Sequence, residues 1–331
     1  MTAGPIDDGT PSTTTEVVAE PAEVVDPGGR LARLPRTASG THSGAFTAPD
    51  WGLLLSCALI WGASFYFMEI GLRALEPGVI TFLRVVFGAL ALGVLPASRT
   101  AVDREDWPRL VLLGGIWMAL PFTMFPLAQQ WINSSLTGML NAAMPVMTAL
   151  VTLAMARRLP ARTQATGLAV GLAGIVAIGW DGLNEGGSSA LGVGLVLVAV
   201  SSYAVSINLA VPLQQRYGSL PILVRIQLVA MVLTSPFAVA GLGASSFEIG
   251  PVMSVVALGV FGTGLAFAAM GTLVGRVGAT RGSISTYLVP IVSISLGAVL
   301  LDEAMHAAAL FGTALVLAGA WLVTRADRGD S

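Results

Sequence analysis

The sequence contains no lysine, and all 17 of its basic residues are arginine. A P-loop ATPase requires the lysine of its Walker A motif, so this chain cannot supply that activity itself. The single cysteine, Cys57, excludes an intramolecular disulfide. Two histidines, His42 and His306, are too few for a histidine-rich metal site. We therefore expect neither a metal site nor a cofactor.

Charge of either sign is scarce. Only 11% of the 331 residues are charged and 54% are hydrophobic, whereas about 25% of the residues in a soluble domain are charged. A soluble fold of this size could not hide so much apolar surface from water. Apolar runs recur from Trp51 to Thr324, each long enough to cross a hydrocarbon core of ~30 Å. The composition predicts an all-α integral membrane protein.

Hydropathy and helix-breaking residues predict ten transmembrane helices. Their expected ranges are 51–72, 77–96, 109–128, 134–156, 163–180, 190–210, 220–241, 251–274, 281–301 and 306–324.

Residues 1–50 differ in composition from the rest of the chain. Their first 26 positions are acidic, contain no basic residue and are rich in Pro, Thr and Gly, a composition that cannot bury enough surface to become ordered. We expect a disordered cytoplasmic tail; a mis-chosen start codon is the alternative. Residues 325–331 are expected to form a cytoplasmic C-terminal tail.

The distribution of arginine indicates how the chain threads the membrane. With ten crossings and a cytoplasmic N-terminus, eleven arginines lie on the cytoplasmic side: Arg99, Arg104, Arg109, Arg157, Arg158, Arg162, Arg216, Arg276, Arg281, Arg325 and Arg328. The outer loops hold one arginine and several acids: Arg73, Glu76, Asp181, Glu185, Glu248, Asp302 and Glu303. This asymmetry follows the positive-inside rule and predicts that both termini are cytoplasmic.

A spacing recurs in the two halves. Pro145 precedes Gly167 by 22 residues and Gly174 by 29, and Pro290 precedes Gly312 and Gly319 by the same intervals. Five helices per half is an odd number, so the second copy must enter the membrane inverted. The pattern predicts repeats at 51–180 and 190–324, an arrangement typical of secondary transporters with a binding site near the midplane.

Several segments resemble the EamA-type transporters of the drug/metabolite transporter superfamily. They include "LIWG" at 59–62, Arg84 in "FLRVV", Pro145 in "NAAMPVMTAL" and "ATGLAVGLAGIVAIG", followed by "YLVPIVSISLGAVLLDE" and "FGTALVLAGAWLV" in the second copy. The likeness covers about residues 53–324, although Arg157-Arg158 stands where many members have Gly-Glu. The resemblance implies a ten-helix carrier, commonly an exporter of amino acids or other small metabolites.

Two arginines and one acid fall inside predicted spans. Arg84 and Arg225 could bind an anionic group of a solute such as a carboxylate, or they could form structural ion pairs or extend toward the interface. Glu69 could couple transport to protons, or pair with Arg73 or Arg84.

Further polar and aromatic residues are candidates for the same site, with helix packing as the alternative. They are Asn141, Ser202, Tyr203, Asn208, Gln227, Tyr287 and Trp61. Pro145 and Pro290 are expected to bend their helices and free backbone carbonyls. Close helix packing is expected at Gly167, Gly171, Gly174, Gly312 and Gly319, with Gly167-xxx-Gly171 a weak signal for a homodimer.

The leading interpretation is a secondary transporter with a small-molecule solute and the lipid bilayer as partners. A membrane-embedded enzyme is disfavoured because the spans contain no HExxH, no GxSxG and no paired aspartates. A non-transporting scaffold remains a third alternative and predicts a central space lined only by apolar side chains. No nucleic-acid partner is expected, because the arginines follow the membrane sidedness and form no patch.

Overall fold

A computed structural model of the chain describes residues 45–157, 159–184, 187–277 and 279–326. This part is built from helices and contains no strand. The proposed tails, residues 1–44 and 327–331, lie outside the described residues, as does Arg158.

In the part of the chain that the structure describes, seven helical segments are long and apolar enough to cross a membrane. They are α1 (Ala48–Leu72); α3, η3 and α4 (Trp107–Leu113, Gly114–Ala119, Leu120–Ala128); α5 and α6 (Ser134–Asn141, Met144–Ala156); α7 (Arg162–Asn184); α8 (Gly187–Tyr217); α9 (Ser219–Gly241); and α10, η5 and α11 (Ile249–Ala257, Leu258–Leu265, Ala266–Val277). Three shorter apolar helices complete the set: α2 (Pro77–Gly93), α13 (Ile284–Leu300, after the one-turn α12, Ala279–Gly282) and α14 (Ala307–Ala326).

Some predicted boundaries shift for identifiable reasons. The range 190–210 was too short, because α8 continues through Pro212 to Tyr217. The range 134–156 is two helices: α5 stops at Asn141 and α6 restarts at Met144, with Pro145 in its first turn, where a proline needs no amide partner. Asn133 caps α5 by accepting a hydrogen bond from the Leu136 amide at 2.7 Å. The segments η3 and η5 are π-helical, so neither long span is a regular α-helix.

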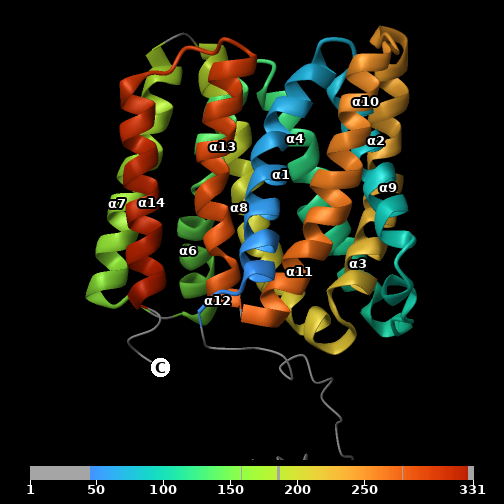
Figure 1. Cartoon of the computed structure of the whole chain (residues 1–331), viewed down its shortest axis with the longest axis horizontal. Coiled ribbons are helices and arrows are strands. Elements are labelled where there is room, and N and C mark those ends of the chain that lie inside the picture. Colours follow the sequence, from blue (N-terminus) through green and yellow to red (C-terminus); the bar gives the residue numbers. More distant parts are fainter. Residues whose placement is uncertain (1–44, 158, 185–186, 278, 327–331) are drawn as a thin grey trace, which may run out of the picture. The chain divides into compact units, whose positions relative to one another are not determined.

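The helices lie side by side in one bundle (Figure 1). We call the end at which α1 begins and α14 finishes the lower end, and the opposite end the upper end. α7 and α14 run antiparallel and share the most intimate contact. A Cβ added at Gly174 would lie 2.6 Å from the Gly312 carbonyl oxygen, and one added at Gly167 would lie 2.8 Å from that of Gly319. Only glycine allows this approach of the two backbones.

Helix contacts repeat between the first and second halves. α2 packs against η5 as α9 packs against η3, and α2 and α9 pack against each other. α1 packs against α10, α11 and α13, and α8 correspondingly packs against η3, α4 and α6. The only described non-glycine residues with positive φ are Arg157 (52°) and Asp302 (53°), which stand 145 positions apart, as Pro145 and Pro290 do.

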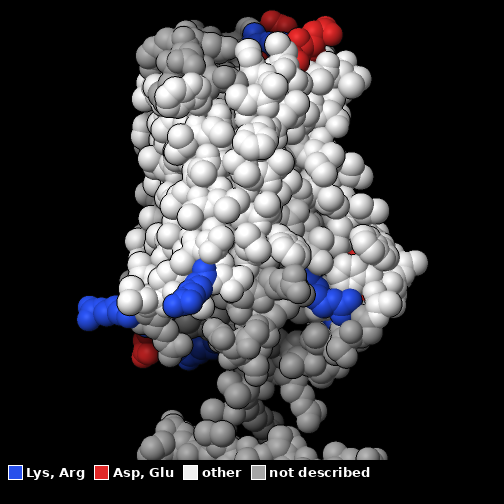
Figure 2. Space-filling model, turned by 90° about the vertical axis from the view of Figure 1, so that its left-hand side faces the viewer, with Lys and Arg blue, Asp and Glu red and all other residues white. Residues whose placement is uncertain are grey.

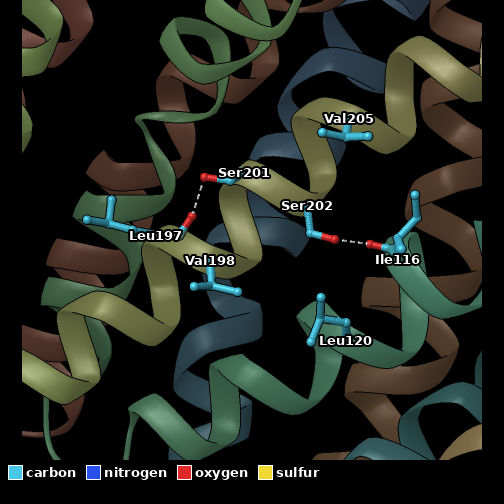
Figure 3. Close-up of a pocket in the computed structure, with 7 residues that line it drawn as sticks. All are labelled: Ile116, Leu120, Leu197, Val198, Ser201, Ser202 and Val205. Atoms are coloured by element: carbon cyan, nitrogen blue, oxygen red, sulfur yellow. Dashed lines mark hydrogen bonds between the residues drawn. The ribbon is translucent and has the colours of Figure 1, made fainter.

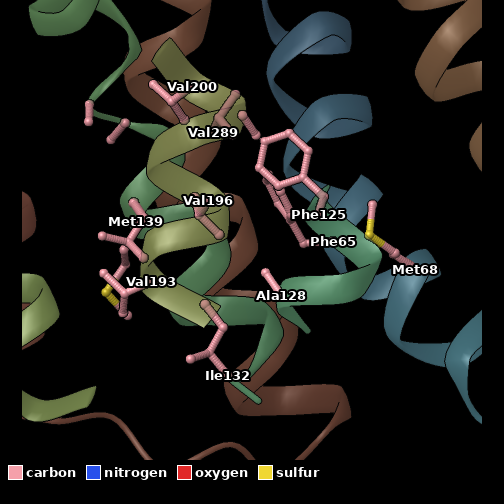
Figure 4. Close-up of a cluster of buried hydrophobic side chains, with 14 of the residues drawn as sticks. Phe65, Met68, Phe125, Ala128, Ile132, Met139, Val193, Val196, Val200 and Val289 are labelled. Atoms are coloured by element: carbon pink, nitrogen blue, oxygen red, sulfur yellow. The ribbon is translucent and has the colours of Figure 1, made fainter. Parts of the chain in front are cut away.

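Buried side chains fill the upper half and leave space in the lower half. One large cluster connects the upper parts of α1, α2, α4, α5, α8 and α13, with Phe65 and Phe125 edge to face at 5.7 Å (Figure 4). Lower down, the buried residues form three separate clusters, at α2–α3–α8–α9, at α6–α7–α14 and at α1–α11. The bundle is therefore solid at its upper end and divided at its lower end.

The outer surface suits a lipid environment. Large apolar side chains point outward, including Leu59, Val176, Val232, Phe237 and Phe311, each at least 57% exposed, which water would penalise. On the face shown in Figure 2, arginines gather toward the lower end and acidic side chains with an arginine occupy the upper rim. A broad belt of uncharged surface separates them.

Candidate functional site

A central cavity of about 600 Å³ occupies the space between the three lower clusters. Its deepest walls come from Met68 of α1, Arg84 of α2 and Tyr203 of α8. From there it continues to residues at the lower helix ends: Gln164, Gln214, Ser219, Val274, Ser283 and Val323. The cavity thus runs from the middle of the bundle to the arginine-rich end, and the packed upper cluster closes its other end.

Among the residues that the structure describes, Arg84 is the only charged one that lines the cavity. Its side chain is 6% exposed, its Nε donates a hydrogen bond to Thr263 Oγ1 at 2.9 Å, and its guanidinium lies 3.8 Å from the centre of the Phe122 ring. Among the described residues, no carboxylate lies within ion-pairing distance of it. Because a buried charge without a counter-ion is costly, this guanidinium is well suited to bind an anion entering the cavity.

Aromatic rings form much of the wall around Arg84. Trp61 and Trp117 each pack edge to face against Phe267, with ring centroids 5.7 and 6.2 Å apart. The Trp61 indole N–H donates to the Gly262 carbonyl oxygen at 3.2 Å, which fixes its orientation against the irregular η5 segment. These rings provide rigid apolar surface beside a single fixed positive charge.

Four of the predicted binding residues line this cavity: Trp61, Arg84, Asn141 and Tyr203. Asn141 is the last residue of α5, and Pro145 lies across the break between α5 and α6. The chain therefore interrupts its helix at Pro145 instead of bending a continuous one, and this interruption faces the cavity. Pro290 lies inside α13, which runs without a break.

Arg225 lies outside the cavity lining. Its guanidinium donates to the backbone carbonyls of Pro221 (2.8 Å), Ser98 (3.3 Å) and Thr100 (2.7 Å), so it holds the loop between α2 and α3 at the lower end. Arg225 therefore does not share the cavity with Arg84.

The other four predicted residues also lie outside the lining. Ser202 donates to the Ile116 carbonyl oxygen and faces an outer groove between η3 and α8 (Figure 3). The Asn208 side-chain amide accepts a hydrogen bond from the Thr152 hydroxyl and donates one to the Ala204 carbonyl oxygen. Gln227 is fully buried, and its amide has no hydrogen-bond partner among the described residues. Tyr287 packs against the α6–α7–α14 cluster.

Glu69 directly follows Met68 on α1 but is not among the residues that line the cavity. Its Oε2 atom is buried and finds no hydrogen-bond partner in the described part of the chain. No ion pair with Arg73 or Arg84 forms within 4 Å among these residues.

The Glu303 side chain, for which the sequence predicted no role, makes a contact that closes the upper end. The Glu303 carboxylate accepts hydrogen bonds from the Ser134 amide (2.9 Å) and hydroxyl (2.7 Å), and from the Ser135 amide (2.9 Å) and hydroxyl. These groups form the N-terminus of α5, where backbone amides lack helical partners and favour an anion. The left-handed turn at Asp302 brings the Glu303 amide to the Gly297 carbonyl oxygen at 3.1 Å. We call the contact of Glu303 with Ser134 and Ser135 the upper latch.

Two ion-pair groups fasten the lower end at its edges. Asp50, fully buried, accepts from Arg276 Nε at 2.6 Å and connects α1 to α11. Arg216 bonds Asp103 at 2.6 Å and Asp106 at 2.9 Å, and so connects α8 to the start of α3. Asp50, Asp103 and Asp106 are thereby paired outside the cavity. Within the described residues, no cluster of three or more His, Cys, Asp or Glu could hold a metal ion.

A helical bundle with a lipid-compatible surface, and a central cavity that contains a buried cation and polar groups, defines a multi-pass membrane transport protein. The EamA-like transporter family model matches residues 51–180 and 190–325, two successive matches that cover most of the chain. The chain belongs to the EamA-like transporter family.

Relatives extend along nearly the whole membrane part. A protein of Archaeoglobus fulgidus named an uncharacterized transporter is 21% identical over 83% of this chain and 98% of its own. A probable amino-acid metabolite efflux pump of Escherichia coli strain K12 is 26% identical over 82% and 94%. A probable terminal-alkyne amino-acid exporter of Streptantibioticus cattleyicolor is 24% identical over 84% and 94%. A solved crystal structure shares the fold, with a TM-score of 0.61 and 18% identity over 86% of this chain and 100% of that chain.

Proposed function

We propose that the chain is a secondary exporter of small carboxylate-bearing metabolites, amino acids or similar compounds, and that it works by alternating access. All ten helices cross a cell membrane as two inverted halves, with the arginine-rich lower end and both termini in the cytoplasm. In this conformation the cavity faces the cytoplasm, and the upper latch closes the outer side.

The observation that carries the proposal is the buried guanidinium of Arg84 at the closed end of a cavity that runs to one end of the bundle. A cation fixed there without a counter-ion is costly to the folded protein, and binding of an anionic solute offsets that cost. The polar lining, which also includes Asn141 and Tyr203, argues against a scaffold with a purely apolar interior. Two relatives named as exporters of amino acids or their metabolites support the direction and the solute class.

Several observations support the inverted halves. The family model matches twice, and the helix contacts correspond between the halves. The 145-residue interval relates the prolines, the glycines of α7 and α14, and the two positive-φ turns. α2 spans about 25 Å, since its 17 residues rise ~1.5 Å each, and slight local thinning of the bilayer accommodates such a length.

Flux measurements test the proposal. Purified protein in proteoliposomes is assayed with a panel of amino acids, N-acyl amino acids and 2-oxo acids. We expect flux of carboxylates, and we expect Arg84→Gln to abolish this flux. Arg225→Gln also removes a charge from a membrane helix, but we expect this variant to retain solute binding. Absence of flux for every solute by folded protein, or unchanged flux in Arg84→Gln, would refute it.

A further inference from the structure

The charge that the described residues contribute to the cavity lining is of positive sign only. Arg84 supplies a positive charge, and no acidic residue of the described part of the chain lines the cavity. The nearby acids are engaged elsewhere or lie outside the lining: Asp50 and Asp106 pair with arginines at the lower end, Glu303 forms the upper latch, and Glu69 of α1 is not a lining residue. Among the described lining residues, a bound solute therefore meets a counter-ion for a carboxylate but none for an ammonium group.

This asymmetry matters because an α-amino acid carries both charges. Its carboxylate can bind Arg84, but its ammonium must leave water without a counter-ion, and such desolvation is costly. The aromatic rings compensate only in part: the guanidinium of Arg84 already covers Phe122, and Phe267 is in edge-to-face contact with both Trp61 and Trp117. The neutral polar groups of Asn141 and Thr148 can bond an amide, a ketone or an ammonium, but they do not neutralise a charge. A neutral substituent avoids the penalty because it carries no charge to desolvate.

On the basis of the function proposed above, we infer that the preferred solutes are apolar or aromatic monocarboxylates without a free ammonium group, such as N-acyl amino acids and 2-oxo acids. The ring-lined wall receives the apolar part, and Arg84 holds the carboxylate. The volume of about 600 Å³ accommodates solutes of this size. Zwitterionic amino acids bind the same site more weakly, and amines without a carboxylate are excluded by Arg84.

Four ligands that share a phenyl ring separate the charge classes. Exchange of radiolabelled N-acetylphenylalanine is measured in proteoliposomes in the presence of N-acetylphenylalanine, phenylpyruvate, phenylalanine or phenethylamine as unlabelled competitor. We expect the two monoanions to compete at least about tenfold better than phenylalanine, the cost of leaving one polar group unpaired, and phenethylamine not to compete.

A matched variant supplies the missing charge. Asn141→Asp changes the side-chain shape little and places a carboxylate in the cavity, so it should lower the preference for N-acetylphenylalanine over phenylalanine. Isothermal titration of the purified variant with both ligands gives the same comparison without flux. Equal affinity of the wild-type protein for the two ligands, with exchange intact, would overturn this inference and leave the carrier proposal standing. Absence of binding and exchange for all carboxylates would instead overturn the proposed function.

Discussion

The upper latch gives the sharpest test of the proposed alternating access. Glu303→Gln keeps the side-chain shape but replaces one carboxylate oxygen by an NH₂ group. If the remaining oxygen still faces Ser134, the new NH₂ faces the Ser135 amide, donor against donor. The Ser135 hydroxyl can rotate to accept a bond, but the backbone amide cannot.

The loss follows from these contacts. One bond to the Ser135 amide disappears, and the charge that strengthens the other three and complements the α5 N-terminus is removed. A hydrogen bond to a charged group contributes about 1.5–3 kcal/mol, and Glu303 is partly exposed, so we expect a destabilisation of the closed upper end by about 2 kcal/mol. That energy raises the ratio of open to closed states about 30-fold.

Cysteine accessibility measures this ratio. Ser293 is 1% exposed and lies on α13 one turn below Gly297, which contacts the latch, and one turn above Val289, which lines the cavity. Ser293→Cys in a Cys57→Ala background provides a single thiol, and an impermeant maleimide is added from the outer side. Glu303→Gln should increase the labelling rate about 30-fold.

The neighbouring acid provides the control. Asp302 is exposed and has a left-handed backbone, a conformation that asparagine tolerates. Asp302→Asn removes the same charge from the same loop but spares the latch, so labelling should not change. Equal labelling rates in Glu303→Gln and the parent protein would show that the latch does not hold the upper end closed.

Two further predictions concern packing and threading. Gly174→Leu should destabilise the protein by about 1–3 kcal/mol or more, because the leucine side chain would collide with the α14 backbone. Thermal unfolding in detergent measures this loss. Gly194→Leu is the control and should have little effect, because a Cβ added at Gly194 meets nothing within 4 Å. Impermeant labelling of cysteines placed at Thr100 and Ser246 should report opposite faces of the membrane; labelling from the same face would contradict the proposed threading.

The sequence identified the helices well because lipid imposes a simple requirement. Apolar runs had to extend across the hydrocarbon, and arginine had to avoid it, so composition alone revealed the apolar helices and singled out Arg84. Irregularities within helices were harder to predict. The π-helical segments η3 and η5 and the break before Pro145 depend on neighbouring helices, which sequence periodicity does not describe.

Assignment of side chains to the cavity succeeded only in part, for a related reason. Membrane helices are apolar on most faces, so a polar residue such as Ser202 or Gln227 gives no information on the direction in which its helix face points. Trp117, Phe122 and Phe267 line the cavity, but as aromatics in apolar runs they gave no distinguishing signal. Glu303 was undervalued because its partners Ser134 and Ser135 lie 169 and 168 positions away in the chain.

The left-handed turns at Arg157 and Asp302 have the same backbone geometry although their residues carry opposite charges. The same backbone conformation occurs in each half with a base in one and an acid in the other, so the reversal of the chain does not depend on the sign of its charge. Under the proposed inversion, duplication of one fold followed by a few charge exchanges in its loops is sufficient to set the direction in which each copy inserts.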